Sequence, residues 1–221
     1  MTSGTGRPGR PPVLLAAGLA AAYGAFGLTF RGPRARFWPR MTWTGLALGL
    51  LALGADGSAR PPRIGWRDVA LGLGSAAGLY GIFKIGDRVA RCVIPGGAQQ
   101  IDDIYSLGQL RHSLELATRL GLIIGPAEEL FWRGFVLRRA QQWLGRWAGA
   151  AASTAAYGGA HFVTGNVTLI GAAAIAGAYW SALAAMGMPM AALIVSHSAW
   201  DIWVFLVAPT ATHRQSSPGF A

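Results

Sequence analysis

The chain has 221 residues, of which 52% are hydrophobic and only 13% are charged, and its mean hydropathy is +0.38. Soluble domains carry about 25% charged residues, so the composition excludes an ordinary soluble domain and predicts a polytopic helical membrane protein. The formal net charge of +10 does not indicate nucleic-acid binding, because the arginines occupy short segments between apolar runs, where topology-setting charges are placed. Cys92 is the only cysteine, which excludes an internal disulfide and a thiolate metal cluster.

The first half of the chain predicts a basic, disordered tail over residues 1–12 and then three membrane spans. The spans are expected at 13–30, 41–55 and 69–85. Two of them contain GxxxG pairs, Gly45/Gly49 and Gly74/Gly78, which allow close contact between helices in lipid. The polar stretch 87–110 is expected to be a loop that leads to a short amphipathic helix around 111–119.

The second half predicts four more apolar segments, which brings the total to about seven spans. These segments are 114–140, 147–163, 167–186 and 189–207, and a disordered tail follows from residue 209. The first segment is too long for one simple span. Proline favours the first position of a helix and kinks a helix elsewhere, so we expect the helix to restart or bend at Pro126. The positive-inside rule does not orient the seven spans, because either choice places eight arginines inside.

Ionisable residues occur in three of the apolar segments. They are Glu128, Glu129 and Arg133 in the first, His161 in the second, and His197 and Asp201 in the last. A charge inside a membrane costs at least about 2.5–3.5 kcal/mol on insertion scales, and such residues are functional-site candidates by default. A packing role explains one buried histidine or one Glu–Arg pair as well as a functional site does. Three such segments in one half of the chain favour a site.

The spacing of these residues separates their roles. Glu129 and Arg133 are four residues apart, so they share one helix face with the acid on the amino-terminal side, which suits an ion pair. Glu128 points about 100° away from Glu129 and must face something else. The same spacing of four relates Tyr157 to His161, and His197 to Asp201 in the last segment.

Taken in order, Glu128-Glu129-x-x-x-Arg133, Tyr157-x-x-x-His161 and His197-x-x-x-Asp201 resemble the motif set of the CPBP family. This family comprises CAAX-type proteases and bacteriocin-processing enzymes and is also called Abi. The resemblance covers roughly residues 120–205. It divides the chain into accessory transmembrane helices and a polar loop at 13–112 and a catalytic core at 113–208.

The resemblance implies an all-α intramembrane endopeptidase, similar to CAAX prenyl protease 2, with its catalytic groups in a buried polar cavity between helices. Glu128 would be the general base that activates water, helped by His161. His197 and residue 201 would stabilise the tetrahedral oxyanion. Glu129, Arg133 and Tyr157 would support them. The spacing agrees, because an ion pair between Glu129 and Arg133 leaves Glu128 free to act as a base.

Two residues depart from the family pattern. Tyr157 stands where the family commonly has Phe, which preserves the ring and adds a hydroxyl group. Asp201 stands where Asn is common, and an ionised Asp has no N–H to offer an oxyanion. Asp201 would therefore have to be protonated, or would orient His197 and favour its imidazolium form. We favour the orienting role.

We expect no cofactor and no metal, although two Glu and two His could ligate zinc. No H-E-x-x-H motif is present, so zinc would need ligands from three helices. Two functions other than proteolysis remain open for these residues. One is a non-catalytic membrane protein, such as a bacteriocin-immunity factor or a scaffold, and the other is a proton-coupled transporter. No inverted repeat supports the transporter.

The expected partners are a membrane-embedded or membrane-anchored protein or peptide substrate and the lipid bilayer, with no nucleic acid. The expected location is the plasma membrane, as a multi-pass protein. The Ala-, Gly- and Arg-rich composition points to a bacterial cell membrane. The sequence predicts no particular oligomeric state.

Overall fold

The computed structural model describes residues 12–55 and 62–209, and these residues form helices and short connections with no strand among them. The all-α prediction is confirmed. The helices outside the centre of the fold are α1 (Pro12–Phe30), α2 (Phe37–Ala55), α3 (Trp66–Val93), α4 (Gly97–Tyr105), α8 (Arg146–Ala160), α9 (Val167–Ala185) and α10 (Met190–Ile202). The two tails predicted to be disordered lie outside the described residues, except at residues 12 and 209.

The centre of the fold is one continuous helical stretch from Ser113 to Leu144. It comprises α5 (Ser113–Arg119), a π-helical segment (Leu120–Ile124), α6 (Gly125–Glu129), a second π-helical segment (Leu130–Leu137) and α7 (Arg138–Leu144). The backbone stays helical on both sides of each junction, so the helix does not restart at Pro126. Instead, Gly125 donates its N–H to the carbonyl of Leu120 five residues earlier, and the wider turn absorbs the irregularity.

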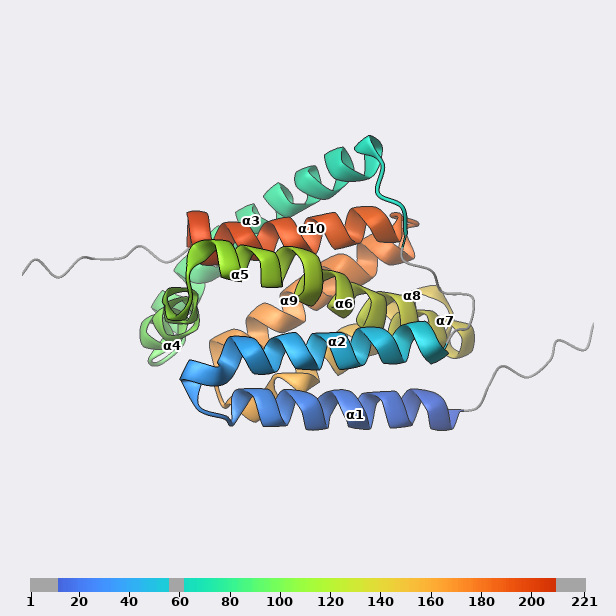
Figure 1. Cartoon of the computed structure of the whole chain (residues 1–221), viewed down its shortest axis with the longest axis horizontal. Coiled ribbons are helices and arrows are strands. Elements are labelled where there is room, and N and C mark those ends of the chain that lie inside the picture. The colour runs from blue at the N-terminus through green and yellow to red at the C-terminus, as the bar shows by residue number, and fades with distance from the viewer. Residues whose placement is uncertain (1–11, 56–61, 210–221) are drawn as a thin grey trace, which may run out of the picture.

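The other helices surround this central stretch (Figure 1). Helices α2, α8 and α10 pack directly against it, while α1 lies on α2, α3 lies on α10, and α9 lies on α8. In the figure, α1 and α2 run side by side below the central stretch, and α3 lies on the opposite side beyond α10. Helices α2 and α10, which the sequence places far apart, therefore meet at α6.

Glycines allow two of these contacts to be close. Gly45 and Gly49 of α2 face Ala127, and a Cβ at Gly49 would lie 3.1 Å from the Cβ of Ala127. The first GxxxG pair thus makes the close contact that the sequence predicts. In α3 the close contact is at Gly72, where a Cβ would lie 2.6 Å from Val195, whereas a Cβ at Gly74 would meet nothing within 4 Å.

The predicted polar loop at 87–110 is mostly helical. Helix α3 continues for 28 residues to Val93, α4 follows, and a 3-10 turn (Ser106–Leu110) leads to α5. Beyond the expected span end, Asp87 and Arg91, one turn apart, form an ion pair at 3.2 Å that adds to the stability of the helix. The amphipathic helix begins at Ser113, and the exposed His112 caps it by accepting the N–H of Leu114 at 3.3 Å.

Among the residues that the structure describes, four helices are long and apolar enough to cross a membrane. They cover Val13–Phe30, Trp66–Val93, Val167–Ala185 and Met190–Val207. Large apolar side chains on their outer faces, such as Leu28, Leu73 and Ile85, are exposed in the isolated chain, as expected for a surface in contact with lipid. These features indicate a membrane protein, and the total of about seven spans stays a prediction.

Candidate active site

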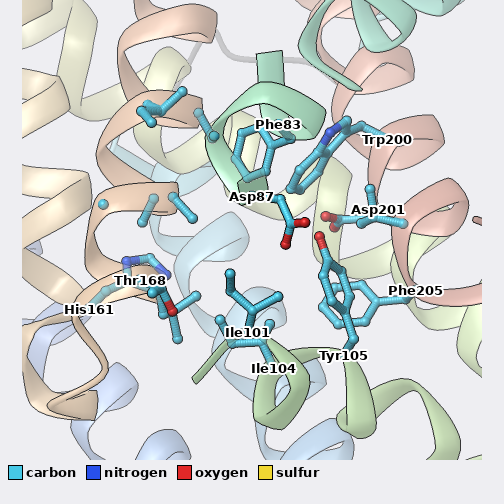
Figure 2. A pocket seen from close by; sticks show the side chains of 18 of the residues that line it. Phe83, Asp87, Ile101, Ile104, Tyr105, His161, Thr168, Trp200, Asp201 and Phe205 are labelled. Carbon is cyan, nitrogen blue, oxygen red and sulfur yellow. The ribbon is translucent and has the colours of Figure 1, made fainter. Parts of the chain in front are cut away.

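A cavity of about 580 Å³ opens between the central helical stretch, α3, α4, α8, α9 and α10 (Figure 2). Most of its walls are apolar. Its polar residues include Glu128, Tyr157, His161, His197 and Asp201. The cavity therefore brings together the four predicted catalytic residues and the supporting tyrosine. Glu129 and Arg133 do not line it, which agrees with the predicted separation of the two glutamates.

Glu128 projects from α6, and its side chain is almost fully buried. The hydroxyl of Tyr157 donates to Oε2 of Glu128 at 3.0 Å. Among the described residues, no other hydrogen bond reaches the Glu128 carboxylate. Oε1 is therefore left for a water molecule or a substrate. The hydroxyl that distinguishes Tyr157 from the Phe common in the family thus contacts the predicted general base.

Glu129 and Arg133 form the predicted ion pair, with 2.9 Å between Oε1 and Nη1, and both side chains are buried. The guanidinium of Arg133 also lies against the rings of Tyr157 and Trp180, at 5.0 and 5.3 Å from their centroids. Oε1 of Glu129 has a second partner that the sequence did not predict, because Nδ1 of His197 lies 2.7 Å from it. The pair is therefore joined directly to a predicted catalytic histidine.

His197 is held on three sides. In addition to the contact with Glu129, its ring stacks on the indole of Trp180, with 4.0 Å between centroids and 20° between planes. Its other ring nitrogen, Nε2, lies 3.6 Å from Oδ2 of Asp201, one turn further along α10. The predicted pairing of His197 with Asp201 is thus a close electrostatic contact, slightly longer than a hydrogen bond.

His161 follows the last residue of α8. Its Nδ1 lies 2.9 Å from the backbone carbonyl of Tyr157. A carbonyl oxygen only accepts, so Nδ1 carries the proton and Nε2 of the neutral ring is an acceptor. The rings of Phe26 and Phe30 from α1 pack against the imidazole at 5.2 and 5.6 Å. Helix α1, which carries no motif residue, therefore helps to fix the orientation of His161.

Asp87, Tyr105 and Thr168 are polar residues of the cavity that were not predicted from the sequence. Asp87 of α3 and Tyr105 of α4 line it, and Figure 2 shows the Asp87 carboxylate and the Tyr105 hydroxyl pointing to the same region as Asp201. Arg91 pairs with Asp87 at 3.2 Å and with Asp102 at 2.8 Å, and so ties α3 to α4 beside the cavity. The spacing of four between Asp87 and Arg91 could have predicted their ion pair, but it does not indicate that Asp87 reaches the cavity.

Two of the nitrogen and oxygen atoms that could ligate zinc already have protein partners. In the described ranges, no three His, Cys, Asp or Glu side chains are grouped as metal ligands would be. Nδ1 of His197 is engaged by Glu129, and Oε2 of Glu128 is engaged by Tyr157. A zinc ion would have to replace these contacts, and no step is assigned to one.

Residues 111–203 match the family model of the type II CAAX prenyl endopeptidases described as Rce1-like. The matched region contains all seven predicted site residues and excludes α1, α2, α3 and α4. Neither a curated protein nor a solved structure matches the chain. Residues 111–203 are therefore similar to the Rce1-like type II CAAX prenyl endopeptidases, in agreement with the resemblance of the motifs.

Proposed function

We propose that this protein is an intramembrane endopeptidase in which Glu128 activates water for attack on a peptide carbonyl. One observation carries the proposal: Glu128, His161 and His197 come from three separate segments of the chain and line the same cavity. The family supports protease activity in general. The assignment of individual residues to steps is our own.

In the proposed mechanism, Glu128 accepts a proton from the attacking water. The Tyr157 hydroxyl, which donates to Oε2, restrains the carboxylate and leaves Oε1 to bind the water. Nε2 of His161 can accept the water's second hydrogen and so orient its lone pair towards the carbonyl carbon. After attack, the carboxyl group of Glu128 gives its proton to the leaving amine, and the peptide bond breaks.

His197 stabilises the negative charge on the tetrahedral oxygen. The Glu129 carboxylate can only accept, so Nδ1 of His197 must carry a proton. Nε2 can donate to an oxyanion only when the ring is an imidazolium, and the mechanism requires that form. Carboxylates near both nitrogens, from Glu129 and Asp201, can stabilise its charge. A charged donor held in a site with little water stabilises an oxyanion strongly.

We propose that the substrate is a membrane-embedded or membrane-anchored protein or peptide. The mostly apolar walls of the cavity suit an apolar segment next to the scissile bond. The family description names CAAX prenyl endopeptidases, and a lipid-anchored carboxy terminus is one substrate of this kind. We also propose that the protein lies in the plasma membrane of a bacterium as a multi-pass protein.

The test compares wild type with Glu128→Ala for cleavage of membrane-anchored peptides and for the cellular phenotype of a deletion strain. We expect the substitution to abolish cleavage and to reproduce the deletion phenotype. If the Glu128→Ala protein instead fully restores the deletion strain, the result supports a non-catalytic role, as an immunity factor or a scaffold. A chelator added to the same assay tests for zinc, and joint loss of stoichiometric zinc and activity would overturn the metal-free mechanism.

A further inference from the structure

His197 belongs to a closed ring of four side chains. Its Nδ1 contacts Glu129, Glu129 pairs with Arg133, and the guanidinium of Arg133 lies 5.3 Å from the centroid of the Trp180 ring. Trp180 closes the ring by stacking on His197 at 4.0 Å. With the hydrogen bond at Nδ1 alone, the imidazole could still rotate about the axis of that bond. The indole of Trp180 limits this rotation, because its plane lies against the plane of the imidazole.

The orientation of the indole is itself fixed from outside this ring. Nε1 of Trp180 donates to Oγ of Ser196 at 3.0 Å, and Oγ of Ser196 lies 2.9 Å from Oγ of Ser75. Both Trp180 and Ser196 are fully buried. A second link joins the same elements, because the Tyr179 hydroxyl donates to the backbone carbonyl of Ser75 at 2.9 Å. The chain of contacts therefore runs from α3 through α10 to α9.

We propose that Ser75, Ser196 and Trp180 are positioning residues that hold the His197 ring in its catalytic orientation. Ser75 lies on α3, outside the matched region 111–203, so an accessory helix takes part in the function of the catalytic core. The inference rests on the proposed role of His197. Its physical basis is that a displacement of about 1 Å at a reacting group can cost about 100-fold in rate.

The competing explanation is that the two serines only join α3 to α10. Polar side chains commonly link helices in membranes, with modest contributions to stability. The two explanations differ in what a substitution changes. A packing role affects the unfolding transition and leaves the turnover of folded enzyme unchanged, whereas a positioning role lowers kcat at an unchanged KM.

The test measures kcat, KM and thermal unfolding for Ser75→Ala, Ser196→Ala and Trp180→Phe in the full-length protein. Trp180→Phe keeps an aromatic ring beside His197, and it removes the N–H that Ser196 accepts together with part of the ring area that stacks on the imidazole. We expect kcat to fall about tenfold for Ser196→Ala and for Trp180→Phe, with KM changed by less than about twofold. The matched control is Ser153→Ala, which removes another buried hydroxyl, one that donates to the Trp132 carbonyl at 3.3 Å.

A double-mutant cycle gives the sharpest result. If Trp180 and Ser196 act through one contact, the kcat of the double variant falls by no more than about tenfold. If the two residues act independently, their effects on kcat multiply to about 100-fold. The proposal is overturned if the effects of Ser196→Ala and Trp180→Phe on kcat multiply. It is also overturned if these two variants have the same kcat as the control Ser153→Ala. If Trp180→Phe does not fold, the cycle of Ser75→Ala with Ser196→Ala replaces it.

Glu128→Gln measured in parallel separates this proposal from the proposed function. Full activity of Glu128→Gln contradicts the proposed function itself. An inactive Glu128→Gln together with a fully active Ser196→Ala contradicts only the positioning role.

Discussion

The hydroxyl of Tyr157 donates to Oε2 of Glu128 at 3.0 Å, across the interface between α8 and α6. The backbone carbonyl of the same tyrosine binds Nδ1 of His161 at 2.9 Å. One residue therefore touches both groups that we propose to act on the attacking water, through its side chain in one case and its main chain in the other. Its side chain can be tested without disturbing its carbonyl.

Tyr157→Phe is expected to lower kcat about tenfold while the protein stays folded. A hydrogen bond to a charged group contributes roughly 1.5–3 kcal/mol, and water in the cavity can replace part of that. Steady-state cleavage kinetics check this result. Tyr23→Phe is the control, because the Tyr23 hydroxyl donates to the backbone carbonyl of Ala156 at 3.2 Å and contacts neither Glu128 nor His161 among the described residues. An unchanged rate in Tyr157→Phe would show that the hydroxyl does not restrain the base.

Glu129→Gln is expected to destabilise the fold by about 3–5 kcal/mol, because it leaves Arg133 buried without a charge partner. Thermal or denaturant unfolding in detergent measures this difference. Glu115→Gln is the matched control, since it breaks an exposed pair with Arg119 at 2.9 Å and should cost less than about 1 kcal/mol. Equal stability of the two variants would contradict a structural role for the buried pair.

Asp201→Asn is expected to retain activity, and Asp201→Ala is expected to lose it. Nε2 of His197 lies 3.6 Å from Oδ2, and an amide oxygen at the same place can still orient the ring, whereas alanine cannot. Cleavage rates of the two variants at matched folded concentration decide this prediction. Equal loss in both would contradict an orienting role that Asn can also fill.

Gly72→Ala is expected to loosen the contact between α3 and α10 and to destabilise the protein by about 1–3 kcal/mol. The added Cβ would lie 2.6 Å from Val195 and 2.8 Å from the carbonyl oxygen of Ala192. Gly74→Ala is the control on the same helix, since its Cβ would meet nothing within 4 Å. Unfolding temperatures in detergent compare the two variants, and equal values would show that α3 does not pack closely at Gly72.

The local part of the site could be predicted from the sequence, because it depends on helical spacing alone. Residues four apart share a face, which places Glu129 with Arg133 and His197 with Asp201, and directs Glu128 elsewhere. The structure confirms the Glu129–Arg133 ion pair and the position of Glu128 on the cavity wall. These relationships need no knowledge of how the helices pack.

Contacts between helices could not be predicted in the same way. Nothing in the spacing indicates that Glu129 binds His197, 68 residues further along the chain, or that Asp87 reaches the cavity from α3. The continuous helix at Pro126 also depends on more than the local sequence. A π-helical turn ending at Ile124 accommodates the proline, and neighbouring helices enclose that turn.

The central claim is that the Glu128 carboxylate removes a proton from water. Glu128→Gln keeps the size of the side chain and an oxygen that can accept from Tyr157, but it cannot act as a base. The decisive measurement is kcat of this variant on a membrane-anchored peptide, at an unfolding temperature that matches wild type. We predict a loss of at least about 100-fold, the lower end of general-base effects. A folded Glu128→Gln enzyme with wild-type kcat would contradict the mechanism.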